Sequence, residues 1–162
     1  MIRAVFFGLG LSAASCANAQ LPAVSPDAAV AAAGDCAEAA SAGRVDVGKL
    51  EARGWQAATM RSEGRTVEMP LQIFGKSGAS PVLMISPSQD GSPEGCVLTG
   101  ALERLSDFKE LEAAFTRQFE AAGKKADDRY FRIGSDMVVL TPTGSRSKPS
   151  FRVAVLELGV SK

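Results

Sequence analysis

The sequence predicts a single α+β domain, in which one antiparallel β-sheet of about five to six strands carries helices packed mainly on one face. The apolar residues repeat with a helical period near the N-terminus and again after residue 106, and with the period of two typical of strands in most of the remaining chain. Successive strands joined by short polar turns favour antiparallel pairing, and helices beside such a sheet make an α+β arrangement.

The first predicted helix follows a strong start signal. Ser25 occupies the N-cap position, Pro26 the first helical position and Asp27 the first turn, where a negative charge is favourable. An Ala-rich segment continues to about Ser41, and its narrow stripe of small side chains suits close packing. We therefore expect an N-terminal helix packed against the sheet.

A second, short helix is expected just after it. Asp46 is a suitable N-cap, the helix runs through Arg53, and Gly54 suits the first residue beyond the helix end. Trp55 is then placed to pack back on Leu50, the contact that accompanies a Schellman ending. This predicts Trp55 to be a packed anchor at a helix-to-strand corner, in preference to a ligand-stacking residue.

The strands of the first half are predicted from alternation and turn residues. Residues 55–60 are expected as a first strand, residues 61–65 as a polar turn and residues 66–74 as the next strand. The apolar residues expected to share one face of that strand are Val67, Met69, Leu71 and Ile73. Residues 81–86 are apolar on both faces, as expected near the centre of a sheet, and residues 95–102 follow as another strand.

The clearest helical pattern begins at Asp107, with Ser106 as an alternative cap. The apolar stripe comprises Phe108, Leu111, Phe115, Phe119 and Ala122. Three aromatic residues at helical spacing are typical of a core face, and Gly123 is expected to end the helix. This helix is predicted to cover one face of the sheet.

The remaining strands are predicted from the same period of two. Residues 129–133 and 137–141 are expected to form a hairpin, and Pro142 is expected to end the second of these strands because it has no backbone N–H. Residues 142–150 are expected as a polar, mobile loop, and residues 151–158 as the last strand. The order of elements loosely resembles profilin-like and PAS-like sheets, a likeness of topology that implies no activity.

The N-terminus predicts export. Residues 1–19 resemble a secretory signal peptide, with Arg3 before an apolar stretch and a small-x-small cleavage site that ends at Ala19. Cleavage there leaves one domain, residues 20–162, which we expect in a Gram-negative periplasm or secreted. Lipidation at Cys16 is the less favoured alternative, and the apolar stretch is too short for a transmembrane anchor.

Composition excludes several classes of function. The full chain has 18 basic and 18 acidic residues, so loss of Arg3 leaves 17 against 18, a balance that argues against nucleic-acid binding. The chain contains no His, which excludes Ser-His-Asp and Cys-His catalysis and the usual zinc sites. No metal, cofactor or catalytic residue is therefore expected.

Two cysteines remain after the expected cleavage, Cys36 and Cys96. In an oxidising compartment they most simply form one disulfide, which would join the N-terminal helix to a central strand. The alternative is a redox-active pair, but that role usually needs two cysteines separated by two residues at a helix N-terminus. We expect a structural disulfide.

Three short motifs are better explained as structural elements than as catalytic or ligand-binding sites. Gly75-Lys76-Ser77 resembles the end of a phosphate loop but lies between two strands, which predicts a hairpin turn. Ser145–Lys148 has the spacing of a nucleophile and its base, but in a polar loop that would not desolvate the lysine. The basic and aromatic residues of 124–132 suit a helix end followed by an amphipathic strand.

These observations predict a non-catalytic exported binding or accessory protein of unknown ligand, monomeric or weakly dimeric. The alternative is an inhibitor or partner of an exported cell-wall enzyme. Binding residues are expected in two polar loops, residues 87–94 and 142–150, because loops on a rigid sheet commonly carry such sites. The candidate residues are Gln89, Asp90, Glu94, Ser145, Arg146 and Lys148.

Overall fold

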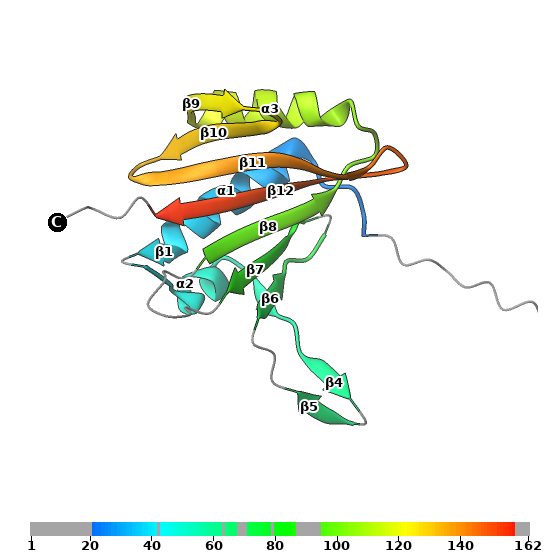
Figure 1. The fold of residues 1–162 in the computed structure, drawn as a ribbon. Helices are drawn as coiled ribbons and strands as arrows, with labels where there is room; N and C mark the ends of the chain where they lie inside the picture. The colour runs from blue at the N-terminus through cyan, green and yellow to red at the C-terminus, as the bar shows by residue number, and fades with distance from the viewer. Residues whose placement is uncertain are drawn as a thin grey trace, which may run out of the picture.

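The structure, a computed structural model, describes residues 21–41, 43–62, 64–67, 71–78, 80–86 and 95–157 (Figure 1). The expected signal peptide, its cleavage site at Ala19 and Cys16 lie outside the described residues. The mixed α+β class with an antiparallel sheet is confirmed. The main sheet of the described residues has eight strands, however, so the prediction of five to six was wrong.

The helices and the eight strands of the main sheet have the following bounds. The helices are α1 (Pro26–Ala39), α2 (Val47–Ala52) and α3 (Asp107–Gln118). The strands, in their order across the sheet, are β3 (Gln56–Ala57), β6 (Gln72–Gly75), β7 (Val82–Ser86), β8 (Gly95–Ala101), β12 (Lys148–Glu157), β11 (Asp136–Ser145), β10 (Asp128–Ile133) and β9 (Glu120–Lys125). Two small hairpins form two-stranded sheets of their own, β1 (Ala40–Ser41) with β2 (Arg44–Val45) and β4 (Met60–Ser62) with β5 (Arg65–Val67).

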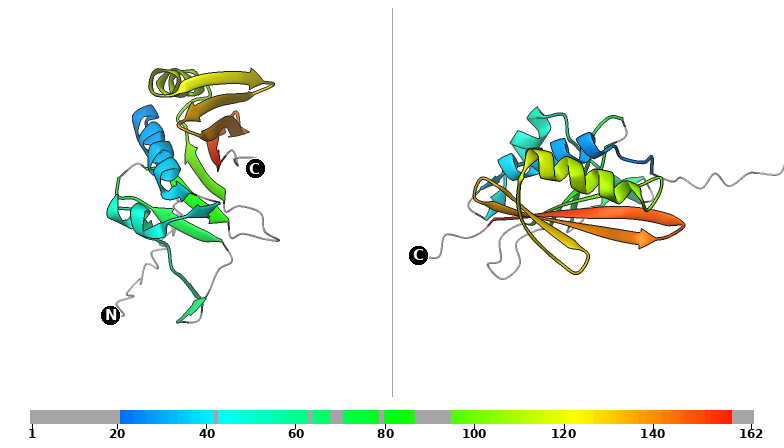
Figure 2. Two further views of the ribbon diagram at one scale, coloured as in Figure 1. Left: turned by 90° about the vertical axis from the view of Figure 1, so that its left-hand side faces the viewer. Right: turned by 90° about the horizontal axis from the view of Figure 1, so that it is seen from above.

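The chain consists of two halves with the same plan. In each half a long helix, α1 or α3, is followed by four strands of the main sheet that pair with their neighbours in turn. The last strands of the two halves, β8 and β12, pair at the centre, where Leu98 lies opposite Val153. Both long helices lie on the same side of the sheet, as expected (Figure 2). The strand order is therefore symmetric about the β8–β12 pair.

The hydrophobic core lies between the sheet and these helices. One cross-strand row on the inner face comprises Phe74, Leu83, Leu98, Val153 and Leu140, all of them buried. Phe115 of α3 is fully buried and its ring centroid lies 5.5 Å from that of Phe131 in β10. Gly100 is required at the centre, because a Cβ atom there would lie 2.7 Å from the Phe151 ring.

The predicted helix starts of the first half are confirmed. The Ser25 side chain accepts a hydrogen bond from the backbone N–H of Ala28, and the Asp46 side chain accepts one from Lys49. The short helix ends in the predicted Schellman motif, since the N–H of Trp55 donates to the carbonyl of Leu50. Local sequence signals therefore determine the start of α1 and both ends of α2, whereas α1 ends at Ala39, two residues before the expected end at about Ser41, and residues 40–41 form β1.

The end of α3 was predicted wrongly. The helix ends at Gln118, and Phe119 is already extended, whereas the sequence placed the end at Gly123. Residues 120–125 instead form the edge strand β9, which pairs with β10, so Ala122 of the expected helical stripe is exposed on a strand. Pairing with a neighbouring strand overrides the helical pattern of the last turn.

The end of β11 was also predicted wrongly, because the strand passes through Pro142 to Ser145. Pro142 lies opposite Phe151, and the hairpin continues until Ser145 lies opposite Lys148. The partner strand β10 begins only at Asp128, so beyond Thr141 β11 has only β12 as a neighbour among the described strands. A proline without an N–H is tolerated at such an edge position.

Candidate binding arm and its buried anchor

The hairpin β4–β5, which we call the arm, leaves the main sheet altogether. The chain exits after β3, where the N–H of Ala58 donates to the carbonyl of Ile73 at 2.7 Å, and it returns in β6. Between these points the arm stands off the sheet edge (Figure 1). The sequence predicted a turn at residues 61–65 between two strands. It did not predict that the strands would separate from the sheet.

The arm exposes apolar side chains in a pair. Met60 and Val67 lie opposite each other in the hairpin, and their exposed fractions are 51% and 41%. Arg65 and Thr66 nearer the tip are exposed as well. Because an isolated two-stranded hairpin is only marginally stable in water, the position of the arm depends on how its roots are held.

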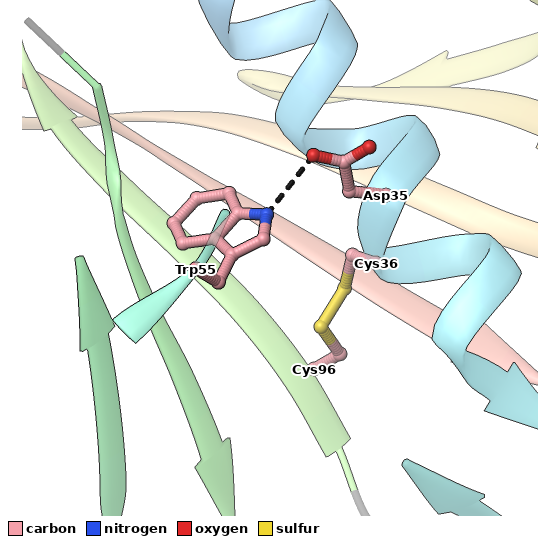
Figure 3. Close-up of a disulfide and its surroundings, with 4 residues drawn as sticks. All are labelled: Asp35, Cys36, Trp55 and Cys96. Carbon is pink, nitrogen blue, oxygen red and sulfur yellow. Dashed lines mark hydrogen bonds between the residues drawn. A yellow bond between two sulfur atoms is a disulfide. The ribbon is translucent and has the colours of Figure 1, made fainter. Parts of the chain in front are cut away.

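The roots of the arm are the strands β3 and β6, and one carboxylate on α1 holds the end of this pair that lies away from the hairpin. Trp55 directly precedes β3 and Lys76 directly follows β6, and the pairing of Gln56 with Gly75 places these two residues side by side. The indole Nε1 of Trp55 donates to Oδ2 of Asp35 at 2.9 Å (Figure 3), and Nζ of Lys76 donates to the same oxygen at 3.1 Å. We call this set, with Arg53, the anchor.

The anchor also includes an arginine at the end of α2. Nη1 of Arg53 donates to Oδ1 of Asp35 at 3.0 Å, and its Nη2 pairs with the exposed carboxylate of Glu38. Nζ of Lys76 lies 5.5 Å from the centroid of the Trp55 ring, within the range of a cation–π interaction. One buried acid therefore joins α1, the end of α2 and both roots of the arm.

The charge state of Asp35 follows from these contacts. The residue is 7% exposed, and burial alone would raise its pKa. The hydrogen bonds from Trp55, Lys76 and Arg53, together with the positive charge of Lys76, outweigh burial and lower the pKa below its ordinary value of 3.8. Asp35 is thus ionised at neutral pH and engaged by three donors, which is the environment of a structural carboxylate and not of a general base.

The predicted disulfide is confirmed and lies beside the anchor. Cys36 of α1 is bonded to Cys96 of β8, with a Cα–Cα distance of 6.2 Å, and both residues are buried (Figure 3). Trp55 is 1% exposed, so the predicted packed role is also confirmed. The disulfide fixes α1 to the centre of the sheet, and the neighbouring Asp35 then fixes the roots of the arm to α1.

The six candidate residues from the sequence lie elsewhere. Gln89, Asp90 and Glu94 fall outside the described residues. Residues 145–148, which include Ser145, Arg146 and Lys148, form the tip of the β11–β12 hairpin, where the backbone N–H of Lys148 donates to the Ser145 hydroxyl at 3.2 Å. The expected loop over 142–150 is therefore an ordered, two-residue hairpin turn with its strands.

Two open hollows border these elements. Ser147 and Lys148 line one of about 680 Å³, together with Leu21 and Ala23 before α1. The other, of about 310 Å³, lies beside the anchor between the alanines of α1 and the turn after β6. Its titratable groups are Asp35 and Lys76, which bind each other. Among the described residues, no group of three or more His, Cys, Asp or Glu side chains is placed to hold a metal ion.

Sequence reasoning missed Asp35, Met60 and Val67. A signal for Asp35 was present, because it lies in an Ala-rich helix and directly precedes the cysteine expected to face the core. Met60 and Val67 carried no signal, since apolar residues in alternating segments are expected to be buried. Lys76 was assigned to a hairpin turn, and the structure places it directly after β6.

In comparisons with known proteins, the chain matches no protein-family model, no curated protein and no solved structure. The resemblance to profilin-like and PAS-like sheets is accordingly not supported. None of the helices in the described part of the chain is long and apolar enough to cross a membrane.

Proposed function

We propose that this chain is a non-catalytic exported protein that binds another exported protein through the β4–β5 arm. The observation that carries the proposal is the arm itself, with the exposed pair Met60 and Val67 and with both roots fixed to Asp35. Export is supported by the pattern of residues 1–19 and is compatible with the disulfide.

A protein is the partner that the arm suits best. A projecting hairpin offers side chains on both faces to a groove, and the apolar pair gives it a surface that gains free energy when water is removed. The anchor holds the roots before binding, which reduces the conformational entropy lost on association. A projecting arm favours the function of an inhibitor or partner of an exported cell-wall enzyme, because an arm can enter the cleft of an enzyme.

The absence of a catalytic role is supported by the surroundings of the titratable groups. Asp35 is saturated by donors, and the hydroxyl of Ser145 at the exposed hairpin tip accepts from a backbone N–H and lies 3.1 Å from that of Ser147. Neither residue has the partner and the dry surroundings that acid–base or nucleophilic catalysis requires.

The test compares exposed apolar residues on two different elements. Met60→Glu with Val67→Glu changes the arm, and Leu105→Glu changes Leu105, which is 50% exposed before α3. Each variant is expressed at native level, and its complexes in periplasmic extract are separated by native electrophoresis. We expect the arm variant to lose a complex that the wild type and the Leu105→Glu variant form. Loss in neither variant, with a small molecule bound to the wild type in native mass spectrometry, would contradict the proposal.

A further inference from the structure

The hollow beside the anchor has the features of a small-ligand site. Its volume of about 310 Å³ lies at the lower end of the range for ligand pockets in proteins, and it opens to solvent. One wall belongs to α1, and the opposite wall belongs to the turn that follows β6. The two walls differ in chemistry, since the first carries methyl groups and the second carries hydrogen-bond donors.

The wall that α1 provides is apolar and built from small side chains. Ala28, Ala31 and Ala32 are spaced three and four residues apart from the first of them, so they share one face of the helix. Ala32 is buried, Ala28 is half-buried and Ala31 is exposed, so this wall extends from the interior to the solvent. Methyl groups in this arrangement provide a surface for the apolar body of a ligand and leave room for it.

The opposite wall carries a partly exposed ammonium group. Nζ of Lys76 donates to Oδ2 of Asp35 at 3.1 Å, and the side chain of Lys76 is 35% exposed. An ammonium group has three N–H donors, so this bond leaves two of them for other acceptors. Ser77 adds a hydroxyl group to the same wall, whereas the hydroxyl of Ser80 donates to the carbonyl of Pro81 at 3.3 Å.

The charges around the hollow favour an anion over a cation. Both carboxylate oxygens of Asp35 are occupied, Oδ2 by Trp55 and Lys76 and Oδ1 by Arg53 at 3.0 Å. Two cations therefore flank this one acid. The second carboxylate near them, that of Glu38, is 60% exposed, pairs with Arg53 and does not line the hollow. A positively charged ligand group would find no open acceptor on Asp35, whereas a negatively charged group would find the ammonium of Lys76.

We propose that this hollow binds a small organic carboxylate that has an apolar body and no ammonium group. The carboxylate accepts a charge-assisted hydrogen bond from Nζ of Lys76, and the apolar body lies on the alanines of α1. The size of the hollow limits the ligand to a small molecule. The site does not include the exposed pair Met60 and Val67, so this proposal does not depend on the proposed function.

The test is an NMR titration of the oxidised protein with benzoate and with benzamide, two probes of nearly the same shape that differ in charge. We expect benzoate to shift the methyl signals of Ala28 and Ala31 and the indole N–H signal of Trp55 in a saturable way, because its ring would lie on α1. Benzamide is expected to bind about tenfold more weakly, since it lacks the charge that strengthens the hydrogen bond from Lys76. No saturable shift with benzoate, or equal binding of benzamide, would overturn the proposal.

Two variants locate the site. Ala31→Glu adds a negative charge at the exposed end of the alanine wall, where it would repel a bound carboxylate, and it is expected to raise the dissociation constant of benzoate about fivefold. The matched control is Ala113→Glu, at an exposed alanine of α3 that does not line the hollow, and it is expected to bind like the wild type. Lys76→Gln removes the ammonium group and is expected to weaken benzoate to about the level of benzamide.

Folding is separated from binding by the choice of positions. Lys76 also belongs to the anchor, so its variant is checked by circular dichroism, whereas Ala31 and Ala113 are exposed helical positions that make no anchor contact. The pair Ala31→Glu and Ala113→Glu therefore decides the question even where Lys76→Gln unfolds. Benzoate binding that is unchanged in Ala31→Glu, or that is weakened equally by Ala113→Glu, would overturn the assignment of the site.

Discussion

The two halves of the chain share one plan and differ in what lies between the strands. In the second half, α3 is held by ordinary means, the aromatic contact of Phe115 with Phe131 and the ion pair of Arg129 with Glu112 at 2.6 Å. Its strands follow one another through tight turns. In the first half, α1 is held by a disulfide and the Asp35 anchor, and the arm interrupts the strands. The disulfide and the anchor are thus found in the half of the chain in which a segment leaves the sheet.

This difference indicates what the first half is built to do. A meander of four strands does not require a disulfide, as the second half shows. The hydrogen bonds of Asp35 go to Arg53, Trp55 and Lys76, which lie where β3 begins and β6 ends, the two strands that the arm connects. We infer that they position the arm. Changes to these contacts should therefore affect the first half of the chain more than the second.

The largest effect is expected from removing the disulfide by Cys36→Ser with Cys96→Ser. The bond closes a loop with a sequence separation of 60 residues, for which chain entropy gives a loss of about 4 kcal/mol in the free energy of unfolding. Urea denaturation followed by tryptophan fluorescence reports on the first half through Trp55, the single tryptophan. A loss below about 1 kcal/mol would mean that the other contacts of α1 suffice to hold it.

A smaller effect is expected from Asp35→Asn. In this variant Lys76 and Arg53 lie beside a neutral amide, and one of their N–H donors loses its acceptor. We expect the free energy of unfolding to fall by about 3 kcal/mol. Hydrogen exchange should become faster in β3 and β6 and stay unchanged in β10–β12. The matched control is Asp107→Asn, at the start of α3, where the carboxylate pairs with the exposed Arg104. Equal exchange changes in both halves would contradict a local role for Asp35.

The smallest effect is expected from acidification. Because contacts lower the pKa of Asp35 below 3.8, its ionised form stabilises the folded state above that pH, and this contribution is lost as the pH falls through the lowered pKa. The thermal midpoint of the wild type should therefore decline more steeply below about pH 4 than that of Asp35→Asn. Parallel declines would show that Asp35 has no lowered pKa in the folded protein.

The features that could be predicted from the sequence are local or covalent. The capping of α1 by Ser25, the Schellman ending at Gly54 and the Cys36–Cys96 pairing each follow from a few neighbouring residues or from elimination. Two predictions, that a helical stripe continues through Ala122 and that a strand ends at Pro142, were wrong for the same reason. In both cases the identity of the neighbouring strand decided the outcome, and local propensity does not contain that information.

The arm and its anchor could not be predicted for a related reason. Residues 66–74 alternate like a single strand, but the buried residue of β6 is Phe74, and Ile73 of the expected face lies on the opposite side. The two strands from which the arm projects are joined to Asp35 through Trp55 and Lys76, which are 20 and 41 residues away from it. Local periodicity in the sequence does not indicate such long-range pairs.

The most direct test of the arm is site-specific photo-crosslinking from two hairpin tips. A photoreactive amino acid is placed at Arg65 in the arm or at Arg146 in the β11–β12 turn, both exposed arginines on hairpins, and the exported protein is irradiated in intact cells. We expect a discrete crosslinked partner from position 65 that disappears in Met60→Glu with Val67→Glu, and no such product from position 146. A partner captured from position 146 alone would contradict the assignment and return the binding role to the loop expected from the sequence.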